Sequence, residues 1–473
     1  MKQKLIGRLA ETNALKTYLD SPQSEFIAVY GRRRVGKTFF VRNIIRDKAD
    51  FMFTGMENAS LSDQLNNFFY SLRHVYPNCN KPTSWIDAFD QLRTFLDNRR
   101  SSTKIVFIDE LPWLDTVRSK FVSALEWFWN GWASSRDDIK LIVCGSATSW
   151  MIDNLLNNRG GLHNRVTHRI HIKPFVLNEC EEYFKVNNFG YRRQEIAELY
   201  MVFGGVPYYY SLMDKGKSVA QNIDCLIFSQ DGELKSEFDN LYRSLFKKPA
   251  DHINIISALS SKGKGLTRAE LLKATKLNNN AKFTETLDEL EKCGFIRQYL
   301  PFESTKKHAI YQIVDPFTLF HFKFERQNVF HDDKFWTNSI NTPSTNAWKG
   351  YAFEMLCLNH IEQIKCALGI AGVQSNICSW KDSGRTEGRG AQIDLLIDRA
   401  DLTVNLCEMK YSPVKYSITK SDYDNFTNKI DLLFRVTGTK KSVIFTMITP
   451  NGIVSNHYSG LVQAVITIDD LFA

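Results

Sequence analysis

The sequence predicts an α/β protein whose first part is a doubly wound parallel sheet. Three apolar runs, at 26–30, 105–108 and 141–144, have the composition of strands that are buried on both faces. Each run is followed by a stretch of helical character, and a glycine-rich turn stands directly after the first. Strands that alternate with helices in this way form a parallel sheet, with a ligand site at the carboxyl ends of the strands.

The glycine-rich turn after the first strand reads Gly31-Arg32-Arg33-Arg34-Val35-Gly36-Lys37-Thr38. It matches the pattern G-x-x-x-x-G-K-[ST] at every fixed position, so strand, turn and helix together predict a P-loop. The glycines let the backbone curl until its N–H groups face phosphate oxygens. Lys37 is expected to reach the β- and γ-phosphates of ATP, and Thr38 to place its hydroxyl on Mg²⁺. The other predicted ATP contacts in this stretch are Gly31, Arg34, Val35, Gly36 and Phe39.

Two carboxylates, Asp109 and Glu110, end the second apolar run. After a P-loop, this arrangement is typical of a Walker B motif. We expect Asp109 to hold Mg²⁺ through water, and Glu110 to orient and deprotonate the attacking water. Ser146 follows the third run at the position of a γ-phosphate sensor. The structural alternative is a strand that stops at a charged turn.

The bulk composition is that of ordinary globular domains. The chain has 473 residues, of which 43% are hydrophobic, and a net charge of +8. This length suggests about three domains of roughly 150 residues each. Nine cysteines are scattered without a C-x-x-C pair, which argues against a disulfide framework or a zinc site. The first residues lack a signal-peptide core, and no apolar run reaches membrane-spanning length. We therefore expect a cytoplasmic protein with no membrane partner.

Four further motifs accompany the P-loop in order along the chain. They are Ile6-Gly7-Arg8, Ile-Asp-Glu-Leu-Pro at 108–112, Arg-Val-Thr-His-Arg-Ile at 165–170 and Gly-Gly-Val-Pro-Tyr at 204–208. Over roughly residues 1–230, the chain resembles the archaeal-type AAA+/STAND ATPases. The resemblance implies that Gly7 and Arg8 lie near the adenine, and that a segment within a helical lid, near 204–207, closes over the nucleotide.

Arginines in the segment 157–175 are candidates for contacting phosphate or a neighbouring subunit of a homo-oligomer. They are Arg159, Arg165 and Arg169, of which Arg165 is assigned to the ATP site. A solvated basic turn is an equal alternative.

Residues 250–316 resemble a winged helix, with three helices followed by two strands. Thr267 is the expected N-cap of the second helix, with Glu270 as its capping-box partner. Such folds often place the third helix in the major groove. Here that helix, at about 280–293, is rich in acidic residues and is a poor surface for phosphates. We therefore favour a structural or protein-contact role over DNA reading.

Charged residues stand on two apolar strands in the last part of the chain. The first strand carries Gln392 and Asp394, and the second carries Glu408 and Lys410. Residues two apart on a strand share a face, so Glu408 and Lys410 point the same way and Asp394 can face them from the neighbouring strand. Carboxylates bind Mg²⁺, which lowers the pKa of a bound water that a lysine can orient or deprotonate.

This pattern, Asp followed by Glu-x-Lys, resembles the PD-(D/E)XK nuclease site, although the usual proline is absent before Asp394. The resemblance implies a restriction-endonuclease-like α/β domain in which Glu354, on the first helix, is an additional acidic ligand. The implied metal ligands are Asp394, Glu408 and Glu354, and the implied catalytic residues are Asp394, Glu408 and Lys410. An inactive relic and a domain that only binds are the alternatives.

The predicted order of parts is a P-loop ATPase core (1–175), a helical lid and linker (176–249), a winged helix (250–316), a connector (317–346) and the nuclease-like domain (347–473). The predicted function is ATP hydrolysis, with Lys37 and Glu110 as catalytic residues, coupled to Mg²⁺-dependent cleavage of nucleic acid, with DNA favoured. One alternative is an ATP-dependent signalling or scaffold switch whose last domain binds without cleaving. A weaker one is a nucleic-acid remodeller.

Overall fold

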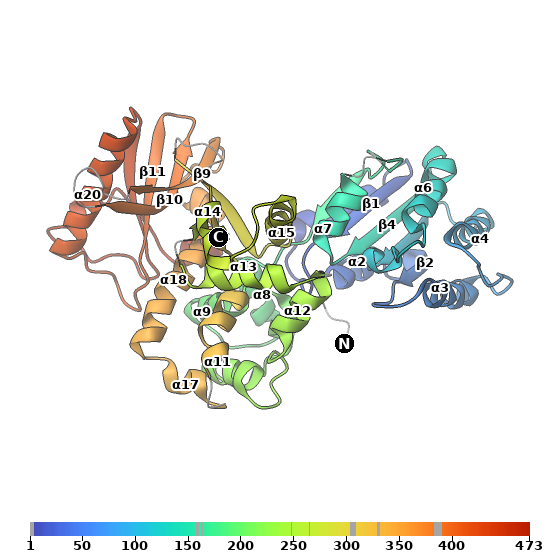
Figure 1. Ribbon diagram of the computed structural model, residues 1–473, viewed down its shortest axis with the longest axis horizontal. Coiled ribbons are helices and arrows are strands. Elements are labelled where there is room, and N and C mark those ends of the chain that lie inside the picture. Colours follow the sequence, from blue (N-terminus) through green and yellow to red (C-terminus); the bar gives the residue numbers. More distant parts are fainter. Residues whose placement is uncertain are drawn as a thin grey trace. The chain divides into compact units, whose positions relative to one another are not determined.

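The structure is a computed structural model that describes residues 4–157, 160–162, 164–246, 248–263, 265–302, 309–328, 332–382 and 390–473. The chain divides into two compact units. The first comprises Met1–Pro174 and Ser244–Lys247, and the second Phe175–Arg243 and Lys248–Ala473. Figure 1 follows the elements of both units along the chain.

The first unit contains a five-stranded sheet in which every described pairing is parallel. The strand order is β2-β3-β4-β1-β5, so the first strand of the chain lies inside the sheet. β3 and β4 are buried along their whole length, as the apolar runs predict. The predicted parallel α/β fold is therefore confirmed. The strands are β1 (Glu25–Tyr30), β2 (Ala49–Thr54), β3 (Lys104–Asp109), β4 (Ile139–Gly145) and β5 (His168–His171).

Helices cover both faces of this sheet, because the strands are apolar on both sides. One core packs α1 (Leu9–Leu19) and α2 (Lys37–Ile45) against the sheet. The other packs α3 (Leu61–Val75), α4 (Trp85–Asp97) and α6 (Phe121–Gly131) against the opposite face. The shorter elements are η1 (Arg46–Lys48), α5 (Leu111–Leu114), η2 (Ala133–Ser135), α7 (Thr148–Trp150) and η3 (Met151–Leu156).

The spacing of apolar residues from Val117 to Trp132 predicts a helix over 117–133, but the helix α6 begins later, at Phe121. Val117 is 88% exposed and belongs to the preceding loop. Its apolar side chain fitted the helical spacing by chance, and the later start at Phe121 corrects the prediction.

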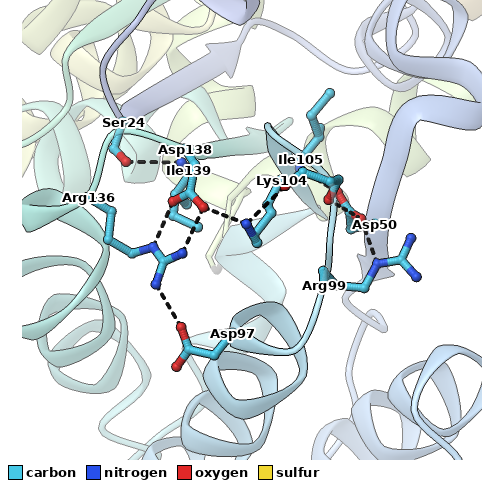
Figure 2. A network of polar contacts seen from close by, with 10 residues as sticks. Ser24, Asp50, Asp97, Arg99, Lys104, Ile105, Arg136, Asp138 and Ile139 are labelled. Atoms are coloured by element: carbon cyan, nitrogen blue, oxygen red, sulfur yellow. Dashed lines mark hydrogen bonds and ion pairs between the residues drawn. The ribbon is translucent and has the colours of Figure 1, made fainter.

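A network of hydrogen bonds and ion pairs lies at the amino ends of β3 and β4, at the end of the sheet opposite the predicted ATP site (Figure 2). Asp138 accepts two hydrogen bonds of 2.7 Å from the Arg136 guanidinium, and Lys104 Nζ lies 2.5 Å from the same carboxylate. Arg136 also reaches Asp97, at 2.7 Å. Asp50, at the start of β2, accepts the backbone N–H of Ile105 at 3.0 Å. The network thus satisfies charged groups that the sheet partly buries.

We expect Asp138→Asn to lower the free energy of unfolding by about 1.5–3 kcal/mol at pH 7, the usual contribution of hydrogen bonds to charged groups. Hydrogen bonds from Arg136 hold the pKa of Asp138 well below its ordinary value. The stabilisation is therefore complete above the unfolded carboxyl pKa of about 3.9, and it is lost as the pH falls through the folded pKa. Denaturant titrations at neutral and acidic pH measure both effects.

The matched control for this prediction is Asp97→Asn, in the same network. The Asp97 side chain is 40% exposed, whereas that of Asp138 is 14% exposed. An exposed ion pair contributes roughly 0–1 kcal/mol. Equal losses in the two variants would contradict the assignment of the stabilisation to Asp138.

The second unit begins with the helices that the sequence predicts as a lid. Gly204 and Gly205 end α9 with φ of +68° and +69°. A Cβ on Gly205 would lie 2.1 Å from the carbonyl oxygen of Phe175, so only glycine fits there. The predicted closure of this segment over the nucleotide stays a prediction. The helices are α8 (Leu177–Val186), α9 (Arg193–Phe203), α10 (Pro207–Ser211), α11 (Val219–Ile223) and η4 (Asp224–Phe228), followed by α12 (Glu237–Leu245), which ends in the first unit.

Three helices and short strands follow in the region that resembles a winged helix. Thr267 caps α14 in a capping box with Glu270, as predicted. The polar stretch Lys306-Lys307-His308, which the sequence predicts as the turn between the two strands, lies outside the described residues, and the winged-helix interpretation stays a prediction. The elements are α13 (Ala250–Ser260), β6 (Leu266–Thr267), α14 (Arg268–Thr275), α15 (Ala281–Lys292), β7 (Ile296–Pro301) and β8 (Ile310–Ile313).

The predicted connector is more helical than its composition suggested. Thr342 accepts a hydrogen bond from the N–H of Thr345 and caps a helix that starts at Pro343, inside the expected linker. The sequence from Lys349 to Leu368 predicts a single helix, whereas the structure has two helices that meet at His360. The elements are α16 (Pro316–Lys323), η6 (Glu325–Gln327), α17 (Phe335–Ser339), α18 (Pro343–Asn359) and α19 (Ile361–Ala367).

An eight-stranded mixed sheet organises the end of the chain, in the order β13-β12-β11-β10-β9-β7-β8-β6. Leu300 in β7 pairs with Cys378 in β9, so strands that the sequence assigns to two separate domains share one sheet. A core of apolar side chains packs α20 onto this sheet. The elements are β9 (Ser375–Asp382), β10 (Ala391–Arg399), β11 (Thr403–Met409), α20 (Lys420–Thr437), β12 (Ser442–Ile448), η7 (Ser459–Leu461), β13 (Ala464–Ile466) and η8 (Asp469–Phe472).

Among the described helices, none is both long and apolar enough to cross a membrane.

Candidate functional site

The turn between β1 and α2 has the backbone shape that a phosphate-binding loop requires. Gly31 has a φ of +148°, and a Cβ there would lie 2.1 Å from the carbonyl oxygen of Ile172. Gly36 precedes α2 with a φ of +87° and has no side chain to cap the helix. The N–H groups of the first turn of α2 therefore remain available to an anion, which the helix dipole favours.

Lys37 is the cation of this loop and is almost fully buried, at 5% exposure. Its Nζ donates a hydrogen bond of 2.8 Å to the carbonyl oxygen of Arg32. Burial lowers the pKa of Lys37, and the nearby carboxylates of Glu110 and Asp109 oppose this only in part. A buried ammonium in such surroundings is stabilised by a strong anion, so the site fits the phosphates of ATP.

The two carboxylates at the carboxyl end of β3 differ in their surroundings. Asp109 is 2% exposed and accepts the backbone N–H of Glu110 at 3.0 Å. Glu110 adopts a left-handed conformation, with a φ of +49°. Its Oε2 accepts hydrogen bonds from the hydroxyl of Ser146 at 2.6 Å and from the N–H of Ser146 at 3.1 Å. The structure thus joins the predicted general base to the predicted phosphate sensor.

We expect Ser146→Ala to lower kcat for ATP hydrolysis by about 10- to 100-fold, a part of the 10²–10⁴-fold that a positioned acid or base supplies. The reason is that the hydroxyl orients the Glu110 carboxylate. ATP affinity should change little, because Lys37 and the loop are untouched. Separate measurement of kcat and of nucleotide Kd checks both statements, with Ser134→Ala on the exposed surface as control. An unchanged kcat would show that Ser146 does not position Glu110.

Arg8 lies against the predicted ATP site, as the family resemblance implies. It is 5% exposed, and its guanidinium donates a hydrogen bond of 3.0 Å to the carbonyl oxygen of Val35. Gly7 and Arg8 both have left-handed backbones, with φ of +61° and +54°. This geometry holds Arg8 at the loop, and its contact with adenine stays a prediction.

The remaining predicted ATP contacts differ in backbone conformation and in solvent exposure. Arg34 is left-handed with a φ of +73°, Thr38 is half-buried and Phe39 is 39% exposed. Arg165 is exposed, and Arg169 donates to the carbonyl oxygen of Leu156 at 3.0 Å. Arg159 lies outside the described residues. The roles of these side chains stay predictions.

Gln64 is a residue of this region that the sequence reasoning missed. It is fully buried, and its Nε2 donates to the carbonyl oxygens of Met56 at 2.7 Å and Trp113 at 3.0 Å. It therefore links the loop after β2 to α5, the short helix that follows the predicted Walker B carboxylates. A polar residue on the otherwise apolar stripe of α3 was the available signal.

A second set of charged side chains lies on β10 and β11. The two strands are antiparallel, and their pairing runs from Asp398 opposite Val404 to Leu395 opposite Cys407, so Asp394 and Glu408 are the next residues of the two neighbouring strands. The pairing of β10 with β9 is irregular between Ile393 and Leu396, at the position of Asp394. Such irregularities redirect a side chain. Gln392 donates to Asp394 at 2.7 Å, which agrees with the predicted shared face.

Glu408 is 6% exposed and is held by two lysines. Lys410 Nζ lies 3.2 Å from Oε1, and Lys429 Nζ on α20 donates to Oε2 at 2.6 Å. Burial alone would lower the pKa of Lys410, but the carboxylates around it, Glu408 foremost, raise it. The sequence reasoning missed Lys429, whose signal was a lysine on the apolar face of its helix.

Glu354, on α18, contributes to the negative field at Lys410. Within the described ranges, however, no group of three or more His, Cys, Asp or Glu side chains is arranged to hold a metal ion. The structure does not bring Glu354, Asp394 and Glu408 together as one such group, and their role as metal ligands stays a prediction. The groups that contact Glu408 are instead two lysines, Lys410 and Lys429. Asp394 and Glu408 still offer the oxygen donors that Mg²⁺ prefers, so the pair fits this metal.

Comparison with known proteins found a family match that lies mostly in the first unit, and a relative that spans both units. Residues 5–213 match the model of a family described as an ATPase domain predominantly from Archaea. An uncharacterized protein of Methanocaldococcus jannaschii is 26% identical over 437 residues, which are 90% of this chain and 92% of the relative.

Two solved structures are similar to the chain at low identity. One is a Walker-type ATPase of Pyrococcus abyssi, 18% identical with a TM-score of 0.49, over 68% of this chain and 97% of the other. The second is the ORC2 protein of Aeropyrum pernix in its ADPNP–ADP complexes, 14% identical with a TM-score of 0.34, over 66% and 91%. The family match and the geometry of the loop agree: the chain carries a P-loop ATPase domain of the archaeal type.

Proposed function

We propose that the chain binds and hydrolyses ATP with Mg²⁺ in its first unit and cleaves nucleic acid, with DNA favoured, at Asp394, Glu408 and Lys410. The observation that carries the second part is the buried Glu408 carboxylate, which pairs with Lys410 on β11, next to the strand β10 that carries Asp394. Acidic oxygens beside a lysine are the groups that hydrolysis of a phosphodiester requires.

At the ATP site, each residue has a task that follows from its position. Lys37 and the N–H groups at the start of α2 bind the phosphates, while Thr38 and Asp109 hold Mg²⁺. The metal, when bound, neutralises charge that develops on the phosphate oxygens. Glu110 receives the proton of the attacking water, and Ser146 holds Glu110 in position through its 2.6 Å hydrogen bond.

At the C-terminal site, Asp394 and Glu408 would hold Mg²⁺, which when bound would supply a water of lowered pKa and polarise the phosphodiester. Lys410 would orient the attacking water and offset the charge of the transition state. The order α18, β9, β10, β11, α20 and β12 supports the resemblance to the PD-(D/E)XK core, because Glu354, Asp394 and Glu408 lie on its expected elements.

Coupling of the two activities is part of the proposal, and contacts inside the second unit support it. On α9, in the predicted lid, Glu198 pairs with Lys349 of α18 at 3.5 Å. The ring of Tyr200 packs against that of His360 with centroids 4.9 Å apart, and His360 Nε2 accepts the N–H of Leu177 at 3.0 Å. A movement of the lid would therefore be transmitted to α18, the helix that carries Glu354.

The test is cleavage of single- and double-stranded DNA and RNA by the purified full chain, with Mg²⁺ or Mn²⁺ and with or without ATP. We expect metal-dependent cleavage that Lys410→Ala abolishes and that responds to ATP in the parent but not in Lys37→Ala. The exposed Lys415→Ala is the matched control. Absence of cleavage under all these conditions would refute the nuclease proposal.

A second candidate is a switch, in which the C-terminal site binds phosphate groups without cutting. The observation in its favour is that lysines contact both oxygens of Glu408. It predicts nucleic-acid binding that depends on the bound nucleotide and that leaves the nucleic acid intact in the presence of Mg²⁺ or Mn²⁺. Binding and cleavage measured on the same samples separate the two candidates.

A further inference from the structure

Lys429 is a charged residue at a position of α20 where the helical pattern predicts a buried, apolar side chain. The buried residues of α20 are Phe426, Lys429, Leu432 and Leu433, spaced as one face of a helix. The side chain of Lys429 is 10% exposed, and Phe426 and Leu433 belong to the core of the C-terminal sheet. Burial of an ammonium is costly unless an anion pairs with it.

The anion that pairs with Lys429 is Glu408. The Nζ of Lys429 lies 2.6 Å from Glu408 Oε2, and Lys410 Nζ lies 3.2 Å from Oε1. One carboxylate thus faces two ammonium groups. Lys410 lies in the field of the Asp422 and Glu354 carboxylates as well, so Lys429 supplies a second cation to a group of acidic side chains.

We propose that Lys429 is a built-in counter-cation. Without metal, its ammonium group occupies the place beside the Glu408 carboxylate that Mg²⁺ takes when it binds. This inference rests on the proposed function, because it assigns a metal to Asp394 and Glu408. Mg²⁺ needs the carboxylate oxygen that Lys429 now contacts, and like charges around one oxygen repel each other. Metal binding therefore requires Lys429 to leave Glu408.

The released ammonium has a use at the same site. Four methylene groups let the Lys429 Nζ move while α20 stays in place, and a lysine near a metal-bound phosphodiester offsets phosphate charge as a point cation. Lys429 would thus pair with Glu408 without metal and contact the phosphate with metal. Such an arrangement makes metal and nucleic acid bind more tightly together than apart.

The test measures binding of Mn²⁺ to the full chain by calorimetry, without nucleotide, so that no phosphate groups occupy the ATP site. We expect Lys429→Met to bind Mn²⁺ about tenfold or more tightly than the parent, because one like charge has been removed. Lys429→Arg retains the charge and should keep the parent affinity. Lys420→Met, at an exposed position of the same helix, is the matched control.

The outcomes separate the inference from the function on which it rests. If the parent binds Mn²⁺ and Lys429→Met binds it equally or more weakly, Lys429 is only a structural partner and the inference is wrong. If neither protein binds Mn²⁺ in a way that Glu408→Gln removes, the metal-dependent function fails, and the inference with it. Melting temperatures recorded with and without Mn²⁺ show whether each variant is folded, since Lys410 still pairs with Glu408 in Lys429→Met.

Discussion

Replacement of Lys37 by alanine is expected to weaken ATP binding by roughly 30- to several-thousand-fold, the effect of about 2–5 kcal/mol that follows loss of one partner of a buried charge pair. The large size follows from burial. Lys37 is 5% exposed, so its ammonium interacts with phosphate in a medium that screens charge poorly. Calorimetric titration with a non-hydrolysable ATP analogue measures the change directly.

Two variants show whether the loss of ATP affinity is caused by removal of the positive charge at position 37. Lys37→Arg keeps a cation but has a wider, planar head group, so it should recover affinity only in part. Lys48→Ala removes an exposed lysine of the same unit and should bind like the parent. If Lys37→Ala bound ATP as tightly as the parent, the assignment of the site to residues 31–38 would be refuted.

The second large effect is expected at Glu408. Glu408→Gln leaves Lys410 and Lys429 without their carboxylate, and removing one partner of a buried ion pair costs roughly 3–5 kcal/mol. Both contacts are short, at 3.2 and 2.6 Å, and Lys429 is nearly buried. Metal-dependent cleavage should be lost in the same variant. Denaturant unfolding and a cleavage assay measure the two effects separately.

The double variant Glu408→Gln, Lys429→Met tests whether the unpaired ammonium of Lys429 causes the loss of stability in Glu408→Gln. If the destabilisation comes from the orphaned ammonium, removing it should recover part of the lost stability, and the two substitutions should not be additive. Glu362→Gln, whose side chain is 74% exposed and pairs with Lys365 at 3.5 Å, should change stability by less than about 1 kcal/mol. Additive losses would contradict the coupling of Lys429 with Glu408.

Local sequence patterns determined much of this protein. The eight residues from Gly31 to Thr38 are contiguous, so their motif alone predicts the loop that joins β1 to α2. Apolar runs are also local, and they placed β3, β4 and the β10–β11 hairpin almost at their observed ends. The capping box at Thr267 was predictable for the same reason.

Only the tertiary structure decided which distant groups meet. Lys429 reaches Glu408 across 21 positions of sequence, and Ser146 reaches Glu110 across 36. The pairing of β7 with β9 joins strands that the sequence assigned to different domains. Such contacts depend on the order and register of strands, which the pattern of a single segment does not encode. The sequence therefore identified the ATP loop, whereas the lysines around Glu408 became visible only once α20 had packed on the sheet.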